Sequence, residues 1–213
     1  MIGLGLSPFN TKFVSHGMPS LLSGLLWGSQ FNGNANDVLG VQNGTSTNVV
    51  YSSGNGVINQ GAGLDGTAYV TLGTGITTTT TFSLSIWLYP TSTAGSYASI
   101  AVTGGGSVGL YFNPTTNKMN YYYSGDHASS TSLTQNAWNH VCITVNAGSL
   151  TFYLNGVANG TSTSVPSALI TRFGRHTGGE AFTGNLDEPY YWNRVITAAE
   201  ISYLASIKTY PFA

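Results

Sequence analysis

Charged residues are scarce in this sequence. Lys, Arg, Asp and Glu together make up 6% of the 213 residues, and six basic against seven acidic side chains leave a net charge of −1. An ordinary soluble domain contains roughly 25% of these residues. So little positive charge provides no electrostatic footprint for nucleic acid or an anionic membrane surface. The composition therefore excludes a basic nucleic-acid-binding protein and a charged helical bundle.

Cysteines and long apolar runs are also lacking. The single cysteine, Cys142, excludes an intrachain disulfide framework and a multi-cysteine zinc site. No apolar run reaches the roughly 18 residues that a membrane-spanning helix needs. The nearest approach to a signal peptide, Lys12 followed by Leu21–Trp27, is interrupted by Ser23 and Gly24 and has no suitable cleavage site. We therefore expect no membrane insertion and, for a protein working outside a cell, release inside a particle.

The sequence is rich in short β-type runs. Hydrophobic residues make up 41% of the chain, which suffices for a packed core. Phe82–Tyr89 and Asn139–Val145 alternate between two faces, as half-buried strands do. Asn155-Gly156 follows the run Leu150–Leu154 and is the dipeptide preferred in tight hairpins. Many short strands separated by Gly, Asn and Ser predict an all-β sandwich or barrel.

One segment near the C-terminus is predicted to be helical. Thr197 and Glu200 have the spacing of a capping box, in which each side chain bonds the other residue's backbone N–H. We divide the chain into an extended N-terminal arm (1–24), a β domain (25–208) and a C-terminal tail (209–213). The arm mixes Gly, Pro and Ser with single apolar residues, and residues 1–26 are interpreted as either flexible or docked onto a partner.

Several motifs occur in the order found in one family. These are Asn32–Gly40, Leu64–Val70, Phe82–Pro90, Trp138–Val141, Phe152–Gly156, Phe182–Glu188, Tyr191–Arg194 and Thr197–Glu200. In this order they make residues 25–207 resemble laminin-G-like domains of the concanavalin A-like lectin and glucanase superfamily. The resemblance implies a two-sheet antiparallel jelly-roll sandwich with one short C-terminal helix. That superfamily contains lectins, glycosidases, adhesion modules and virion proteins, so the fold alone does not give the function.

The acidic residues do not form a catalytic pattern. Glycoside hydrolysis needs two carboxyl groups facing one bond. Only Asp187 and Glu188 are close in sequence, and adjacent residues of a strand point to opposite faces. Gly105–Gly109 matches the G-x-S-x-G pattern of a nucleophile elbow, but a strand-like run follows it where a helix is required. We therefore predict a glycine-rich hairpin, no catalytic residue and no enzymatic activity.

Asp37 and Asp187 are candidate metal ligands. The resemblance implies a structural calcium ion between the N-terminal loop and the closing strand, and these two aspartates occupy the matching positions. Calcium takes six to eight oxygen ligands, which two carboxylates and loop carbonyls can supply. The alternative is that both side chains only accept hydrogen bonds from turn amides.

A glycan-binding site needs exposed aromatic rings with polar groups beside them. Sugars stack on Trp or Tyr while polar side chains bond their hydroxyl groups. We select Tyr122 and Trp192 as stacking residues, with Asp126, His127 and Arg175 in neighbouring loops as polar partners. Because aromatics on strands alternate between faces, we expect at least half of the candidate rings in this region to lie in the core.

Two hypotheses for function follow. The first is a non-enzymatic structural, decoration or adhesion protein on the surface of a bacteriophage virion, which binds glycans and contacts neighbouring virion proteins through residues 1–26. It would form a homo-oligomer or part of a larger assembly, without nucleic acid as a partner. The alternative is a free, extracellular lectin-like module of a cellular surface protein. A glycan-cleaving enzyme is the least favoured hypothesis.

Overall fold

The structure is a computed structural model that describes residues 17–92, 95 and 97–212. These residues are mostly β, as predicted. The elements follow in the order η1 (Pro19–Leu22), β1 (Leu25–Gly28), β2 (Gly44–Thr47), β3 (Val50–Ser52), η2 (Ser53–Asn55), β4 (Gly61–Asp65), β5 (Tyr69–Thr78), β6 (Phe82–Pro90), β7 (Ala98–Thr103), β8 (Gly109–Asn113), β9 (Lys118–Tyr122), β10 (Asp126–Ala128), β11 (Asn139–Asn146), β12 (Ser149–Leu154), β13 (Val157–Ser162), β14 (Ala168–Phe173), β15 (Thr183–Trp192) and α1 (Ala198–Ser206).

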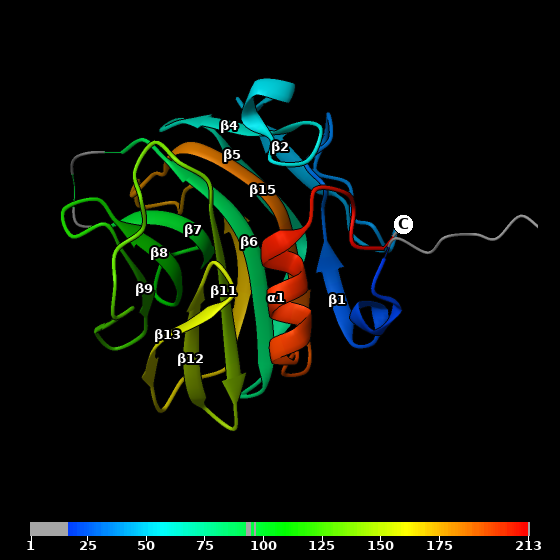
Figure 1. Cartoon of the computed structure of the whole chain (residues 1–213). Coiled ribbons are helices and arrows are strands. Elements are labelled where there is room, and N and C mark those ends of the chain that lie inside the picture. The colour runs from blue at the N-terminus through cyan, green and yellow to red at the C-terminus, as the bar shows by residue number, and fades with distance from the viewer. Residues whose placement is uncertain (1–16, 93–94, 96, 213) are drawn as a thin grey trace, which may run out of the picture.

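The strands form two antiparallel sheets packed face to face (Figure 1). The first sheet has the order β13-β12-β11-β6-β15-β4-β3, and β1 pairs with the part of β15 that β4 leaves free. The second sheet has the order β10-β9-β8-β7-β14-β5-β2. Some neighbours in each sheet are distant in sequence, as in β6-β15 and β7-β14. The predicted two-sheet antiparallel sandwich is confirmed.

Alternation along the strands builds the core between the sheets. Val141, Ile143 and Val145 of β11 point inward and pair with Ile86, Leu84 and Phe82 of β6, all at most 1% exposed. Burying one such side chain stabilises the fold by about 1.5–3 kcal/mol. Each strand therefore presents its other residues on the outer face of its sheet.

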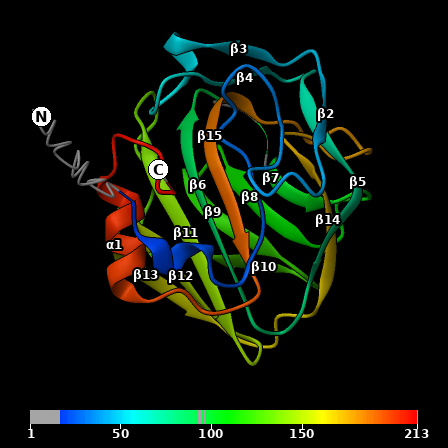
Figure 2. The same cartoon turned by 90° about the vertical axis from the view of Figure 1, so that its right-hand side faces the viewer.

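The outer face of the first sheet is covered by α1 and the segments beside it (Figure 2). Ile201 and Leu204 of α1 pack with Tyr190, Trp192 and Cys142 in a second apolar cluster. The predicted capping box is present, so the helix begins where the sequence indicated. Within the described residues, no helix has the length and apolar character needed to cross a membrane.

Both chain ends were predicted to lie outside the domain, yet their described residues pack on it. Residues 1–16 and Ala213 lie outside the described part. Leu21 is fully buried, and its carbonyl accepts a hydrogen bond from Trp192 Nε1 at 2.6 Å. Phe212 packs edge-on against Tyr190, with ring centroids 4.9 Å apart. These residues join the fold because β15 and α1 leave an apolar surface that they cover.

Candidate functional site

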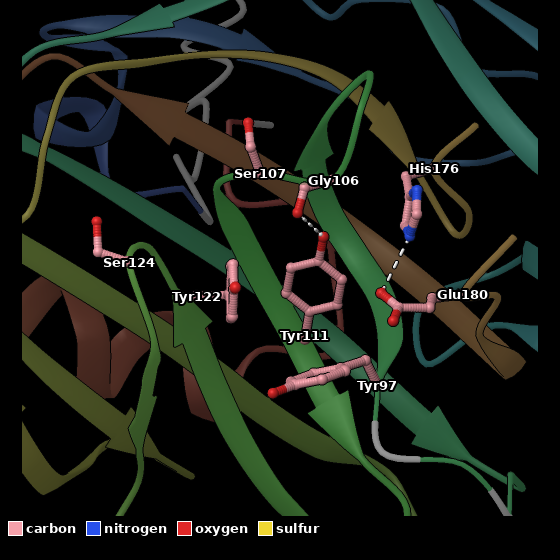
Figure 3. Close-up of a pocket in the computed structure, with 8 residues that line it drawn as sticks. All are labelled: Tyr97, Gly106, Ser107, Tyr111, Tyr122, Ser124, His176 and Glu180. Carbon is pink, nitrogen blue, oxygen red and sulfur yellow. Dashed lines mark hydrogen bonds and ion pairs between the residues drawn. The ribbon is translucent and has the colours of Figure 1, made fainter. Parts of the chain in front are cut away.

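A cleft lies on the outer face of the second sheet, over β7, β8 and β9. Its volume is about 530 Å³. Eight side chains or glycines line it, and Figure 3 shows them: Tyr97, Gly106, Ser107, Tyr111, Tyr122, Ser124, His176 and Glu180. We call this the tyrosine cleft. Unlike the outer face of the first sheet, this surface is not covered by any helix of the described residues (Figure 1).

Strand alternation brings the tyrosines to the outer face. In β8, Leu110 and Phe112 point into the core, so Tyr111 between them points outward. In the same way Tyr121 and its inward neighbours place Tyr122 of β9 outward. Tyr97, directly before β7, completes the group. Its ring centroid lies 5.7 Å from that of Tyr111 and 5.8 Å from that of Tyr122, both in edge-to-face contact.

The phenol groups of the cleft are held by hydrogen bonds. The Tyr111 hydroxyl donates to the Gly106 carbonyl at 2.6 Å, and burial raises the pKa of this phenol. The Tyr97 hydroxyl donates to both carboxylate oxygens of Asp126 at 2.7 Å. This hydrogen bond to Asp126 raises the pKa of Tyr97 to about 12. Tyr111 is 1% exposed and forms the floor, whereas Tyr97 and Tyr122 are half-buried and offer ring surface to a ligand.

His176 and Glu180, from the segment between β14 and β15, also line the tyrosine cleft. His176 Nε2 lies 3.0 Å from Glu180 Oε2, and His176 Nδ1 accepts a hydrogen bond from Gly178 N–H at 2.8 Å. Gly106 and Gly178 lie against the imidazole, and a Cβ at either would come within 3.0 Å of the ring. These two glycines therefore allow the loops after β7 and β14 to close on His176.

The structure brings two of the five predicted glycan-binding residues to this cleft. Tyr122 lines it, and Asp126 borders it through Tyr97. Asp126 and His127 were placed in a loop, but they belong to the short edge strand β10, which pairs with β9. His127 stacks on Tyr123, with centroids 3.9 Å apart, and bonds Ser162 at 2.6 Å. Arg175 forms an isolated bridge with Ala181 and is not among the lining residues.

Trp192 requires a correction. Its side chain is fully buried in the apolar cluster under α1, and its indole N–H bonds the Leu21 carbonyl. A sugar has no access to this ring, because residues 18–23 and the helix cover it. Trp192 is a core residue of the apolar cluster between the first sheet and α1.

The carboxylates of the two predicted metal ligands, Asp37 and Asp187, accept hydrogen bonds from backbone amides. The Asp37 carboxylate accepts four N–H bonds of 3.1–3.3 Å, from Gly28, Leu39, Val41 and Gln42. Asp187 accepts three such bonds of 2.8–3.0 Å. The described residues contain no group of three or more His, Cys, Asp or Glu side chains placed to hold a metal ion. These bonds to backbone amides are the ones that the alternative of turn capping predicts.

Asp187 and Glu188 do not point to opposite faces as strand alternation predicted. Glu188 has a φ of 51°, and the pairing of β15 with β6 shifts between Asp187 and Tyr190, which marks a β-bulge. Glu188 accepts a hydrogen bond from the Tyr190 hydroxyl. Both carboxyl groups are at most 1% exposed, so neither reaches the surface.

Sequence reasoning missed Tyr97, Tyr111 and the pair His176–Glu180 as members of one site. The alternation of Leu110, Tyr111 and Phe112 is a signal for an outward ring. The contact with residues 176–180 depends on the pairing of β14 with β7, which no local pattern shows.

The fold is that of a two-sheet β-sandwich, and residues 64–202, well over half of the chain, match the family model described as the concanavalin A-like lectin/glucanases superfamily. The chain belongs to this family, as its motifs indicated. No curated protein sequence matches it.

Solved structures of low sequence identity share the fold. One is domain 4 of AbnA, a GH43 extracellular arabinanase from Geobacillus stearothermophilus, in complex with arabinotriose, at 20% identity and a TM-score of 0.73, covering 85% of this chain and 98% of that one. The binding domain of Paraclostridial Mosquitocidal Protein 1 has 16% identity and a TM-score of 0.67, covering 87% and 52%. Trypanosoma rangeli sialidase has 13% identity and a TM-score of 0.64, covering 86% of this chain but only 33% of that chain.

Proposed function

We propose that this chain is a non-catalytic carbohydrate-binding domain that holds a glycan in the tyrosine cleft. The observation that carries the proposal is the cleft itself: two half-buried tyrosine rings on an uncovered sheet face, with carboxylate, imidazole and hydroxyl groups around them. Sugar rings stack on such aromatic faces, and their hydroxyl groups bond the polar rim.

Relatives of the same fold support the proposal. The similar arabinanase domain was solved with arabinotriose. Another similar structure, at 17% identity, a TM-score of 0.51 and coverage of 58% of this chain and 40% of that chain, is a putative carbohydrate binding protein from Bacteroides ovatus.

A non-catalytic role is supported by how the carboxylates of the cleft are engaged. Glu180 accepts from His176, and both oxygens of Asp126 accept from Tyr97. A glycosidase needs one carboxylic acid and one carboxylate directed at the same bond. In this cleft the hydrogen bonds instead hold the carboxylates as fixed acceptors at the rim, which suits binding of hydroxyl groups.

Binding is tested on a glycan array with the whole chain and three variants. Tyr122→Ala and Tyr97→Ala each remove one half-buried ring and should weaken binding about tenfold, since an aromatic contact contributes roughly 1 kcal/mol or more. Tyr89→Ala is the matched control, because Tyr89 packs on Trp138 at 5.6 Å on the outer face of the other sheet. A wild-type chain that binds no glycan, or an equal loss in Tyr89→Ala, would refute the site.

For the biological context, we propose an exposed decoration or adhesion protein of a particle such as a bacteriophage virion. The support is a surface in which Ser, Thr, Asn and Gly replace charged residues, together with an aromatic cleft open to the outside. A free, extracellular lectin-like module is the alternative. Sedimentation of intact particles separates the two: the chain should travel with the particles, and recovery only in the soluble fraction favours the free module.

A further inference from the structure

Two hydrogen bonds fix the orientation of the His176 ring beside Glu180. Gly178 N–H donates to Nδ1 at 2.8 Å, so Nδ1 carries no proton. Nε2 therefore carries the ring proton and donates it to Glu180 Oε2 at 3.0 Å. The side chain of Glu180 is 45% exposed, so its negative charge faces the space above the tyrosines (Figure 3).

Asp126 supplies a second negative charge, at the hydroxyl group of Tyr97. Its carboxylate accepts the Tyr97 hydroxyl through both oxygens at 2.7 Å, so the phenol remains protonated beside a carboxylate. None of the eight described residues that line the cleft is Lys or Arg. The tyrosine cleft thus has the Glu180 carboxylate in its lining and the Asp126 carboxylate at its border, and no Lys or Arg is among its described lining residues.

The cleft also has an acceptor directed at a ligand. Glu180 Oε1 has no hydrogen-bond partner among the described residues, whereas Oε2 is used by His176. An ionised carboxylate is an acceptor only, and it bonds hydroxyl groups strongly. It repels a carboxylate or sulfate on the ligand, and this repulsion is larger near a protein surface than in bulk water.

We infer that the tyrosine cleft selects uncharged, hydroxyl-rich glycans and excludes glycans that carry carboxylate or sulfate groups, with Glu180 as the residue that determines this specificity. The inference rests on the proposed function and names the class of glycan that the site takes. Glu180 contributes twice: its free oxygen accepts a sugar hydroxyl, and its charge rejects an acidic sugar at the same position.

Matched pairs of oligosaccharides test the inference with the whole chain. We would compare galactotriose with galacturonotriose and lactose with 3′-sialyllactose by array and by calorimetry. The neutral member of a bound pair should bind at least about tenfold more tightly than the acidic member at about 50 mM salt. This ratio should fall at about 1 M salt, because the Debye length shortens to about 3 Å.

Two variants assign the selection to Glu180. Glu180→Gln keeps the shape and an acceptor for His176, so the ratio of neutral to acidic binding should fall at least about threefold while the neutral glycan still binds. Asp65→Asn removes an exposed charge at the end of β4, outside the cleft, and should leave the ratio unchanged.

The outcomes separate this inference from the proposed function. If the wild-type chain binds both members of each pair equally, or if Glu180→Gln leaves the ratio as it was, carbohydrate binding stands and the charge selection is overturned. If the wild-type chain binds no glycan on the array, neutral or acidic, the proposed function is refuted and so is the inference.

Discussion

Glu200 lies at the centre of a hydrogen-bonded ion pair that joins α1 to the start of the described chain. Its Oε1 accepts from Arg194 Nη2 at 2.7 Å and from Ser20 Oγ at 2.8 Å, and its Oε2 accepts from Arg194 Nη1 at 2.9 Å and Thr197 N at 2.7 Å. Arg194 also donates to the carbonyls of Ser20 and Ser23. The substitution Glu200→Gln removes the negative charge. It also places an amide NH2 group, which is a donor, beside groups that are themselves donors.

The pKa of Glu200 and the burial of its ion pair give similar values for the folding free energy lost in Glu200→Gln. The hydrogen bonds from Arg194 lower the pKa of Glu200 from 4.5 to about 2, which corresponds to about 3 kcal/mol at about 1.4 kcal/mol per pKa unit. Removing one partner of a buried ion pair costs about 3–5 kcal/mol, and Arg194 keeps 26% side-chain exposure, which favours the lower end. We expect Glu200→Gln to lower the free energy of unfolding by about 3 kcal/mol at pH 7, a fall of about 6–12 °C in Tm.

Urea denaturation at pH 7 and pH 3 measures this effect. The folded-state pKa of Glu200 lies below its unfolded value, so its stabilisation is present above pH 4.5 and is lost as the pH falls toward 2. The difference between wild type and variant should narrow to about 1.4 kcal/mol at pH 3. The control Thr197→Ala loses only a helix cap and should cost about 1 kcal/mol at both pH values. A variant as stable as wild type at pH 7, or a difference that does not narrow in acid, would refute the reasoning.

Three further predictions concern the remaining features. Because Asp37 and Asp187 bond backbone amides, a chelator should leave Tm unchanged, and a fall that added calcium reverses would contradict this. Trp192→Phe should lower the unfolding free energy by about 1–3 kcal/mol, because a buried carbonyl loses its donor, while glycan binding on the array stays unchanged. Gly156 has a φ of 83°, so Gly156→Ala should cost about 1 kcal/mol in a urea titration, and an unchanged midpoint would argue against the strained turn.

Much of the fold is predictable because it depends on neighbours in sequence. The hairpin at Asn155-Gly156 has φ values of 50° and 83°, which Asn and Gly adopt more readily than other residues. The helix starts at its capping box because Thr197 and Glu200 are three residues apart. The inward residues of β11 follow from a period of two. None of these features requires knowledge of a distant segment.

The candidate site is predictable only in part, since its members come from several strands and loops. Tyr122 and Trp192 give similar signals in sequence: each is an aromatic residue on an alternating strand near polar positions. Tyr122 lines an uncovered sheet face, whereas Trp192 lies under α1 and the segment around Leu21. The difference depends on which elements pack over each sheet, which the pattern of a single strand does not contain.

The sequence by itself therefore determined the two-sheet sandwich, its closing helix and its family, because alternation, capping and turn chemistry act over a few residues. Only the tertiary structure determined that the outer face of the second sheet is the exposed one. It also determined that Asp126 bonds Tyr97 and that Glu180 bonds His176. The tertiary structure also decided that Asp187 and Glu188, beside the β-bulge, are both buried, and that Asp37 and Asp187 bond amides. The physical reason is that these outcomes depend on contacts between segments far apart in sequence, whose positions follow from sheet order and from burial of the remaining apolar surface.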